Sequence, residues 1–242
     1  MPSVEWNQRV WGEEHGWEHA GDEWRGMADH CGASYPAWKQ GLVATFIEPV
    51  PTGSRVLEIA PGHGRWSGYL LSRAESLALV DIAQPCLDAC RERLDGDPRV
   101  SYHLTGGSSL APLVDQSVDF AWSFDAFVHM DWPIIQGYLY ELARVLTPGG
   151  TAVIHHAGQA DWALSLAPVT RRLGRGGRVL QRWAGQRRLR DSGNRSPVSA
   201  RLLAQGADQA GLRVLRQTDR WGATGQFTVG KYRDCISVLR RP

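Results

Sequence analysis

Short apolar runs alternate with helix-compatible segments along most of the chain, and this alternation predicts strands and helices in turn. The predicted strands cover 55–60, 77–82, 100–104, 118–124 and 151–155. The predicted helices between them cover 65–74, Pro85 to Leu94 and Pro133 to about Leu146. Because helices connect successive strands, we expect right-handed βαβ units and a mostly parallel sheet.

The pattern fails after the fifth predicted strand, from about residue 158 to about residue 196, where glycines and arginines are frequent. A connection this long is usually functional or lacks regular structure, and we treat it as a basic insertion. Beyond it, the sequence predicts a helix over 197–211 and strands over 212–218 and 233–239. The gap between these two strands holds several glycines and no good helix, so we expect them to pair as an antiparallel hairpin.

The first fifty residues precede the predicted sheet and differ from it in composition. They are rich in tryptophan, with glycines that break the segment into short helices and turns. We therefore predict two parts, a helical N-terminal cap at 1–50 and one α/β domain at 51–242. A chain of 242 residues suits one large domain better than two.

Composition places the chain among ordinary globular proteins, with 43% hydrophobic and 21% charged residues. The N-terminus lacks the basic start and apolar stretch of a secretory signal, and no apolar run reaches the roughly 20 residues of a membrane helix. We therefore expect a cytoplasmic protein without a membrane partner. The four cysteines lack the paired spacings of a zinc site, so free thiols and no metal are expected.

Charge is unevenly distributed, although the formal net charge is only +2. Acidic residues dominate the first thirty positions, whereas arginines gather between Arg171 and Arg190. Such an arginine run can bind nucleic acid or form a solvated surface. Because no aromatic or recognition motif is interleaved with it, nucleic acid is not expected as a partner, and a homodimer is left open.

A glycine turn follows the first predicted strand, in the segment Glu58 to Trp66. Gly62 and Gly64 let the backbone approach a ligand, and the following helix presents free N–H groups. Asp81, 19 residues after Gly62, ends the second strand, where a carboxylate can accept both hydroxyls of a ribose. Together these features predict a nucleoside site. A nicotinamide enzyme would want a third glycine where Ser67 stands.

Three segments resemble the class I S-adenosylmethionine-dependent methyltransferases: VLEIAPGHG at 56–64, Val80 to Ile82, and RVLTPGG at 144–150. The resemblance covers about 55–239 and implies a Rossmann-like seven-stranded sheet with an antiparallel last strand and helices on both faces. It also implies S-adenosylmethionine as cofactor and S-adenosylhomocysteine as product. The predicted cofactor residues are Glu58, Ala60, Gly62, Gly64, Trp66, Asp81, Ile82, Gly107, Ser108 and Phe124.

Within this resemblance, Glu58 would lie near the methionyl amino group, Asp81 on the ribose, and Gly107 with Ser108 beside adenine. The sequence departs from the family pattern at two places. Ala60 occupies the usual first glycine, and the loop after the third strand lacks the acid that often binds the adenine amine. The second departure leaves the adenine contact open.

Methyl transfer from a sulfonium needs no metal, but the acceptor must lose a proton. Candidate bases gather after the fourth strand, at Asp125, His129 and Asp131, and at the end of the fifth, at His155 and His156. Both strand ends lie at the carboxyl edge, where open α/β sheets bind ligands. We predict His129 as the base and Asp125 as a residue that orients the acceptor, with His155 and His156 as further catalytic candidates.

Aromatic residues near these positions could stack on a substrate or on the sulfonium, although core packing explains each equally well. The predicted substrate contacts are Trp17, Trp24, Asp131 and Trp132. The segment around Trp24, the glycine turn and the paired histidines also resemble a bacterial subgroup that methylates sugars of natural products. That resemblance implies a sugar-containing small molecule as substrate, and the acidic N-terminus would favour an aminosugar of the aminoglycoside kind.

Three alternatives stay open at this stage. Methylation of RNA is motivated by the arginine-rich insertion, and methylation of a non-sugar small molecule by the same cofactor motif. A non-enzymatic protein could keep the cofactor as a structural ligand or a sensed signal.

Overall fold

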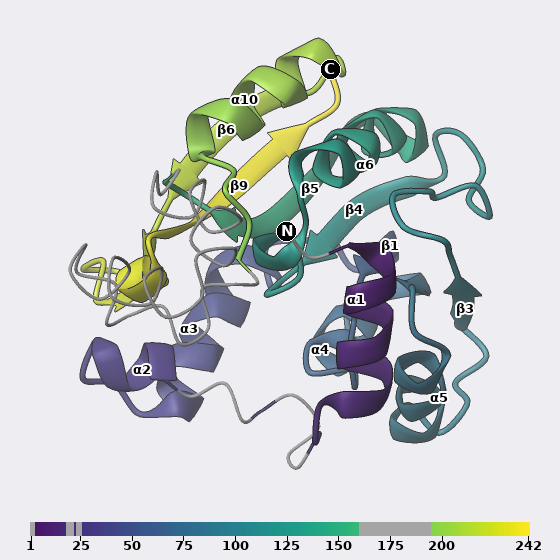
Figure 1. Ribbon diagram of the computed structural model, residues 1–242, viewed down its shortest axis with the longest axis horizontal. Coiled ribbons are helices and arrows are strands. Elements are labelled where there is room, and N and C mark those ends of the chain that lie inside the picture. Colours follow the sequence, from purple (N-terminus) through teal and green to yellow (C-terminus); the bar gives the residue numbers. More distant parts are fainter. Residues whose placement is uncertain (1–2, 18–21, 23–25, 160–194) are drawn as a thin grey trace, which may run out of the picture.

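The computed structural model describes residues 3–17, 22, 26–159 and 195–242. Its centre is a seven-stranded sheet in the order β3-β2-β1-β4-β5-β9-β6 (Figure 1). The strands are β1 Ser54–Ile59, β2 Ala74–Asp81, β3 Val100–Leu104, β4 Val118–Ser123, β5 Leu146–Ala157, β6 Arg213–Thr218 and β9 Asp234–Arg240. Neighbouring strands are parallel except at β9, which runs antiparallel to β5 and β6. The predicted fold class is confirmed.

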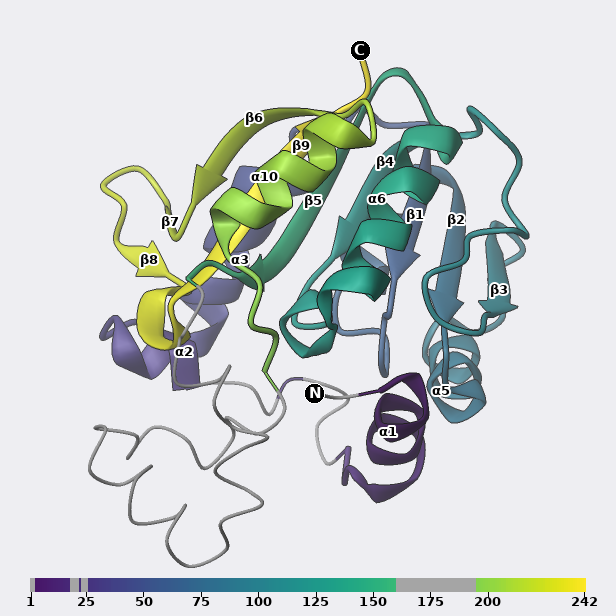
Figure 2. The same cartoon turned by 45° about the horizontal axis from the view of Figure 1, so that its top comes forward.

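Helices cover both faces of this sheet (Figure 2). In that view α6 and α10 lie in front of the sheet, α3 lies behind it, and α1 lies beyond the strand ends. The longer helices are α3 Tyr35–Phe46, α5 Gln84–Arg93, α6 Trp132–Val145 and α10 Ala200–Gln209. The shorter ones are α1 Val4–Arg9, the π-helix η1 Val10–Glu14, α2 Gly26–His30, α4 Ser67–Leu71, and the 3-10 turns η2 Phe127–His129 and η5 Gly230–Tyr232.

Alternation along the strands divides the core into two apolar layers. Val56 and Trp122 face the layer that includes α3, whereas Leu57 and Ile59 face the layer built with α6 and α10. Side chains of a strand point alternately to opposite faces, so strands buried on both sides must be apolar throughout. This requirement explains why the central strands could be recognised from their composition.

The structure differs from the predicted elements in several places. α4 is shorter than the predicted helix over 65–74, and β2 begins at Ala74 instead of residue 77. β5 begins at Leu146 instead of residue 151, because Leu146 already pairs with Val118 of β4. A small ribbon of β7 Arg220–Trp221 and β8 Phe227–Thr228 also forms in the glycine-rich gap. Its two-residue strands are too short to leave a periodic signal.

Other expectations about chain organisation have mixed outcomes. Most of the basic insertion at 158–196 lies outside the described residues, and the division at residue 50 stays a prediction. All four cysteines are free thiols. Within the described ranges, none of the helices has the length and apolar character that crossing a bilayer requires.

Gly206 in α10 offers a test of the packing between α10 and α6. A Cβ there would lie 2.3 Å from the Trp132 ring, whereas a Cβ at Gly68 in α4 would meet nothing within 4 Å. Gly206→Ala should lower the free energy of unfolding by about 1–2 kcal/mol, because overpacking outweighs the gain in helix propensity. Urea unfolding measures the change.

Gly68→Ala is the matched control, and it should leave stability unchanged or raise it by up to about 1 kcal/mol. Equal stability changes in the two variants would contradict the described contact between Gly206 and Trp132.

Candidate functional site

A cavity of about 330 Å³ opens at the carboxyl ends of β1, β2 and β4. Open α/β sheets bind ligands at the carboxyl ends of their strands, at the point where the strand order reverses. Here this point lies between the neighbouring strands β1 and β4. Ten of the sequence-predicted site residues line it: Ala60, Gly62, Trp66, Asp81, Ile82, Gly107, Phe124, Asp125, His129 and Trp17. The structure therefore brings together most of the predicted cofactor residues and the leading candidate base.

The N-terminal segment α1–η1 forms a wall of this cavity. The Asn7 side-chain amide donates to the His129 carbonyl at 3.2 Å, and the Gln8 amide donates to the Ile82 carbonyl at 3.1 Å. Trp11 donates from its indole to the Asn7 side-chain oxygen at 3.0 Å, and its ring centroid lies 5.1 Å from that of His129. These contacts tie the segment to the ends of β2 and β4.

The turn after β1 has the backbone that a glycine-rich cofactor loop needs. The φ angle is +56° at Ala60, +56° at Gly62 and +76° at Gly64. Left-handed φ angles strain residues with a Cβ, so Ala60 stores strain at a position where glycine would not. At Gly62 a Cβ would lie 2.8 Å from the Trp17 ring, so the missing side chain also lets this indole cover the turn.

Two acids flank this turn, and the structure separates their environments. Asp81 lines the cavity; its Oδ1 accepts the Ala83 N–H at 2.9 Å, and burial raises its pKa to about 6. Glu58 lies behind the turn and does not line the cavity. Its carboxylate accepts the Ser67 hydroxyl at 2.5 Å, and burial raises its pKa to about 7. Asp81 is thus the acid that can reach a ligand.

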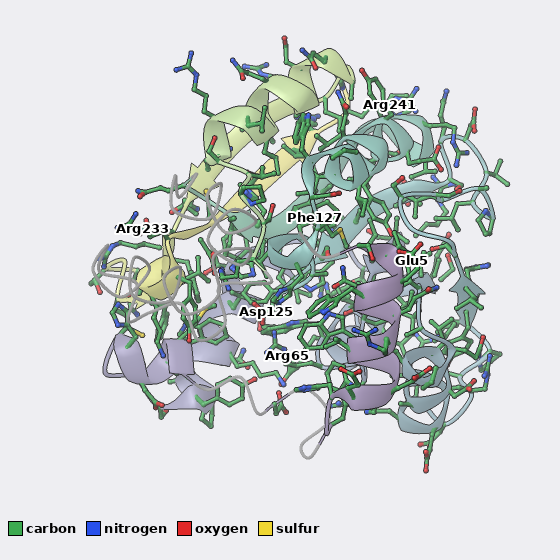
Figure 3. All side chains as sticks on the ribbon, viewed as in Figure 1. Glu5, Arg65, Asp125, Phe127, Arg233 and Arg241 are labelled. Carbon is green, nitrogen blue, oxygen red and sulfur yellow. The ribbon has the colours of Figure 1, made fainter. Side chains whose placement is uncertain are left out.

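A chain of five ionisable side chains, three of them buried and two half-buried, runs along one side of the site, and we call it the ion-pair chain. In order it comprises Arg65, Asp125, His155, Asp234 and Arg195. Nδ1 of His155 lies 3.1 Å from Asp125 Oδ1, and Nε2 lies 3.4 Å from Asp234 Oδ2. The two outer members pair with these carboxylates and line the cavity. Figure 3 labels the first pair, Arg65 and Asp125.

Mutual contacts shift the pKa values of two inner members of this chain, Asp125 and His155. Burial alone would raise the pKa of Asp125, but the Arg65 charge and His155 outweigh it and keep that pKa well below its usual range. Burial would lower the pKa of His155, yet its contacts with Asp125 and Asp234 raise it instead. His155 is fully buried and does not line the cavity, so it can position Asp125 but cannot touch a substrate.

Five other predicted residues do not line the cavity, and one of them is Gly64 of the turn described above. His156 is buried, bonds through Nε2 to the Ser237 hydroxyl at 2.7 Å, and has its pKa lowered to about 4 by burial. Trp132 packs against Gly206, and Ser108 packs against Gly137 of α6. Asp131 precedes α6 as its N-cap residue. The catalytic, cofactor or substrate roles predicted for these residues stay predictions, and this geometry does not support them. Trp24, a predicted substrate contact, lies outside the described residues.

Sequence reasoning missed several residues that the structure places at the site. Arg65 directly follows the glycine turn and could have been singled out from its place in the motif. Arg195, Tyr232 and Asp234 come from distant segments without a motif, and Asn7 carries no special signal in its helix. Only the folded chain brings these four to one edge.

Comparisons with known proteins find a family match over part of the chain. Residues 56–150 match the family model described as a methyltransferase domain. The biotin biosynthesis bifunctional protein BioHC of Cellvibrio japonicus is 33% identical over 105 residues, 43% of this chain and 20% of that protein. A demethylmenaquinone methyltransferase of Clavibacter sepedonicus is 31% identical over 126 residues, 52% of this chain and 48% of that protein. The chain therefore matches less than half the length of these relatives.

Solved structures share the fold at low sequence identity. A geranyl diphosphate C-methyltransferase of Streptomyces coelicolor, in complex with S-adenosylhomocysteine, superposes with a TM-score of 0.67 at 13% identity, covering 100% of this chain and 99% of that one. An S-adenosylmethionine-dependent methyltransferase of Aquifex aeolicus gives 0.56 at 18% identity, covering 85% and 89%. Over residues 56–150 the chain is thus similar to a methyltransferase domain, and its fold is shared with S-adenosylmethionine-dependent methyltransferases.

The residues present fit this cofactor. A buried carboxylate at Asp81 can accept ribose hydroxyls beside the open backbone of Gly62. Indole rings of Trp11 and Trp17 line the same cavity, and aromatic faces attract a sulfonium. Cofactor binding thus calls on residues of both the glycine turn and the N-terminal segment.

The raised pKa of Asp81 predicts a pH dependence of cofactor binding. As the pH rises through about 6, the carboxyl group ionises and accepts hydroxyl hydrogen bonds more strongly. Affinity for S-adenosylhomocysteine should therefore rise about fivefold between about pH 5 and pH 7.5, then level off. Calorimetric titration across this range measures it.

Asp81→Asn should bind more weakly and lose the pH dependence. Glu58→Gln is the control, because Glu58 titrates in a similar range without lining the cavity. A pH dependence that persists in Asp81→Asn would refute the assignment.

Proposed function

We propose that this protein transfers a methyl group from S-adenosylmethionine to a hydroxyl or amine of a small acceptor bound in the cavity. One observation carries the proposal: the cavity lined by Asp81 and the glycine turn is also lined by His129. The cofactor supplies an electrophilic methyl group, so the protein must align the acceptor and remove its proton.

Among the candidate bases, His129 fits best. It lines the cavity from η2, next to the Trp11 ring, and imidazole has an ordinary pKa suited to proton transfer near neutral pH. Asp125 and His155 are committed to the ion-pair chain, so we assign them to positioning Arg65 rather than to proton transfer. This revises the predicted role of Asp125 in orienting the acceptor.

A sugar-containing acceptor stays a proposal, and the indole rings that line the cavity favour it because they can stack on the apolar face of a pyranose. The preference for an aminosugar has less support. Glu5, Glu13 and Glu14, which motivated a cationic acceptor, are exposed and do not line the cavity. The arginine run that motivated an RNA substrate lies outside the described residues.

The first test is binding of the cofactor to the purified protein. Calorimetry should detect association with both S-adenosylmethionine and S-adenosylhomocysteine. The protein saturated with S-adenosylhomocysteine would then be screened by thermal shift against glycosides, phenols and a short RNA, at low and high salt. Absence of any heat with either cofactor form would refute the proposal, and salt-sensitive stabilisation by RNA alone would favour the RNA alternative.

Replacing the candidate base should separate chemistry from binding. His129→Ala should lower kcat by at least about 100-fold, because general base catalysis contributes roughly that much, while affinity for S-adenosylhomocysteine stays within about twofold. Turnover is measured as S-adenosylhomocysteine release with an acceptor from the screen.

His103→Ala is the matched control, since His103 lies on β3, half-buried, and does not line the cavity. It should turn over normally. Unchanged kcat in His129→Ala would rule out its role as the base.

A further inference from the structure

Arg195 and Tyr232 line the cavity on the side away from the cofactor residues. The sheet order places β3, β2 and β1 on one side of β4, and β5 and β9 on the other. Asp81 and the glycine turn follow strands of the first group, whereas Tyr232 comes just before β9. Arg195 therefore lies where the acceptor, rather than the cofactor, would extend.

The Arg195 side chain is held in place from several directions. Its Nη2 pairs with Asp234, whose own side chain is fully buried, and its guanidinium carbon lies 4.9 Å from the Tyr232 ring centroid. The next residue, Ser196, donates its backbone N–H to the Val128 carbonyl at 2.6 Å. The guanidinium is thus oriented before any ligand arrives.

In this orientation the Arg195 guanidinium keeps N–H donors that a ligand in the cavity can use. A guanidinium carries five N–H donors, and among the described residues Arg195 bonds through Nη2 to Asp234 alone. Asp234 also contacts His155, because its Oδ2 lies 3.4 Å from Nε2 of that ring. In the ion-pair chain, Asp234 thus lies next to both Arg195 and His155.

The described carboxylates that line the cavity do not neutralise the positive charge of Arg195. The described carboxylates that line it are Asp81, which lies on the cofactor side, and Asp125, which Arg65 already pairs. Much of the remaining wall is apolar, so a ligand anion would meet Arg195 in surroundings that screen charge weakly.

We propose that Arg195 binds an anionic oxygen group of the acceptor, a carboxylate or a phosphate, and so selects acidic acceptors over neutral ones. This inference rests on the proposed function, because it names the class of acceptor for the same cavity. A sugar acid would satisfy both proposals, whereas a polycationic aminoglycoside would place its charge against Arg195.

A pair of isosteric probes tests this preference without knowledge of the natural acceptor. Binding of 4-hydroxybenzoate and of neutral 4-hydroxybenzamide to the full chain, saturated with S-adenosylhomocysteine, is measured by calorimetry. The anion should bind at least about tenfold more tightly, the effect expected of one charge-assisted pair. Phenyl phosphate against phenol, run in parallel, distinguishes phosphate from carboxylate.

Arg195→Gln should reduce each preference to within about twofold, and Arg195→Lys should retain part of it, because lysine keeps the charge without the planar fork. Arg213→Gln, on exposed β6, is the control and should leave the preference intact. If Arg195→Gln does not fold, the double variant Arg195→Gln, Asp234→Asn removes both charges together.

Equal binding of anionic and neutral probes by the wild-type protein, or a preference that survives Arg195→Gln, would overturn the inference. Failure of the proposed function is seen separately, as a wild-type protein that does not bind S-adenosylhomocysteine. The probe pair can still be titrated in its absence.

Discussion

Buried charges are stable in a protein interior only when each has a partner, and this constraint shapes the acceptor side of the molecule. His155 lies between two carboxylates, and each carboxylate holds one arginine. Removing either carboxylate would leave its arginine without that counter-charge. The chain therefore joins the turn after β1, the ends of β4 and β5, and the start of β9 into one unit.

Strand order makes this unit possible. β4 lies between β1 and β5, so Asp125 after β4 can reach both Arg65 beyond β1 and His155 at the end of β5. The antiparallel direction of β9 brings its first residue, Asp234, to the same edge. A parallel last strand would have placed that carboxylate at the opposite edge of the sheet.

The site divides along the sheet. On the side of β1 and β2, the left-handed backbone of the glycine turn lies beside Asp81, whose carboxylate accepts backbone N–H groups. On the side of β5 and β9, charges are paired and oriented before a ligand binds. Tryptophans of the N-terminal segment line the cavity, and the side-chain amides of this segment bond to the segments that follow β2 and β4. Cofactor and acceptor would therefore meet beneath one shared cover.

Sequence alone determined the architecture and the cofactor side of the site. Buried strands must be apolar, helices between parallel strands recur at regular intervals, and a glycine turn followed by Asp81 lies within one βαβ unit, so each signal is local. Tertiary structure alone decided which acids and histidines meet. Glu58 and Asp81 both end strands, yet only Asp81 faces the cavity, and adjacent His155 and His156 point to opposite faces. Arg195 and Asp234 belong to the site through contacts between distant segments, which no local pattern records.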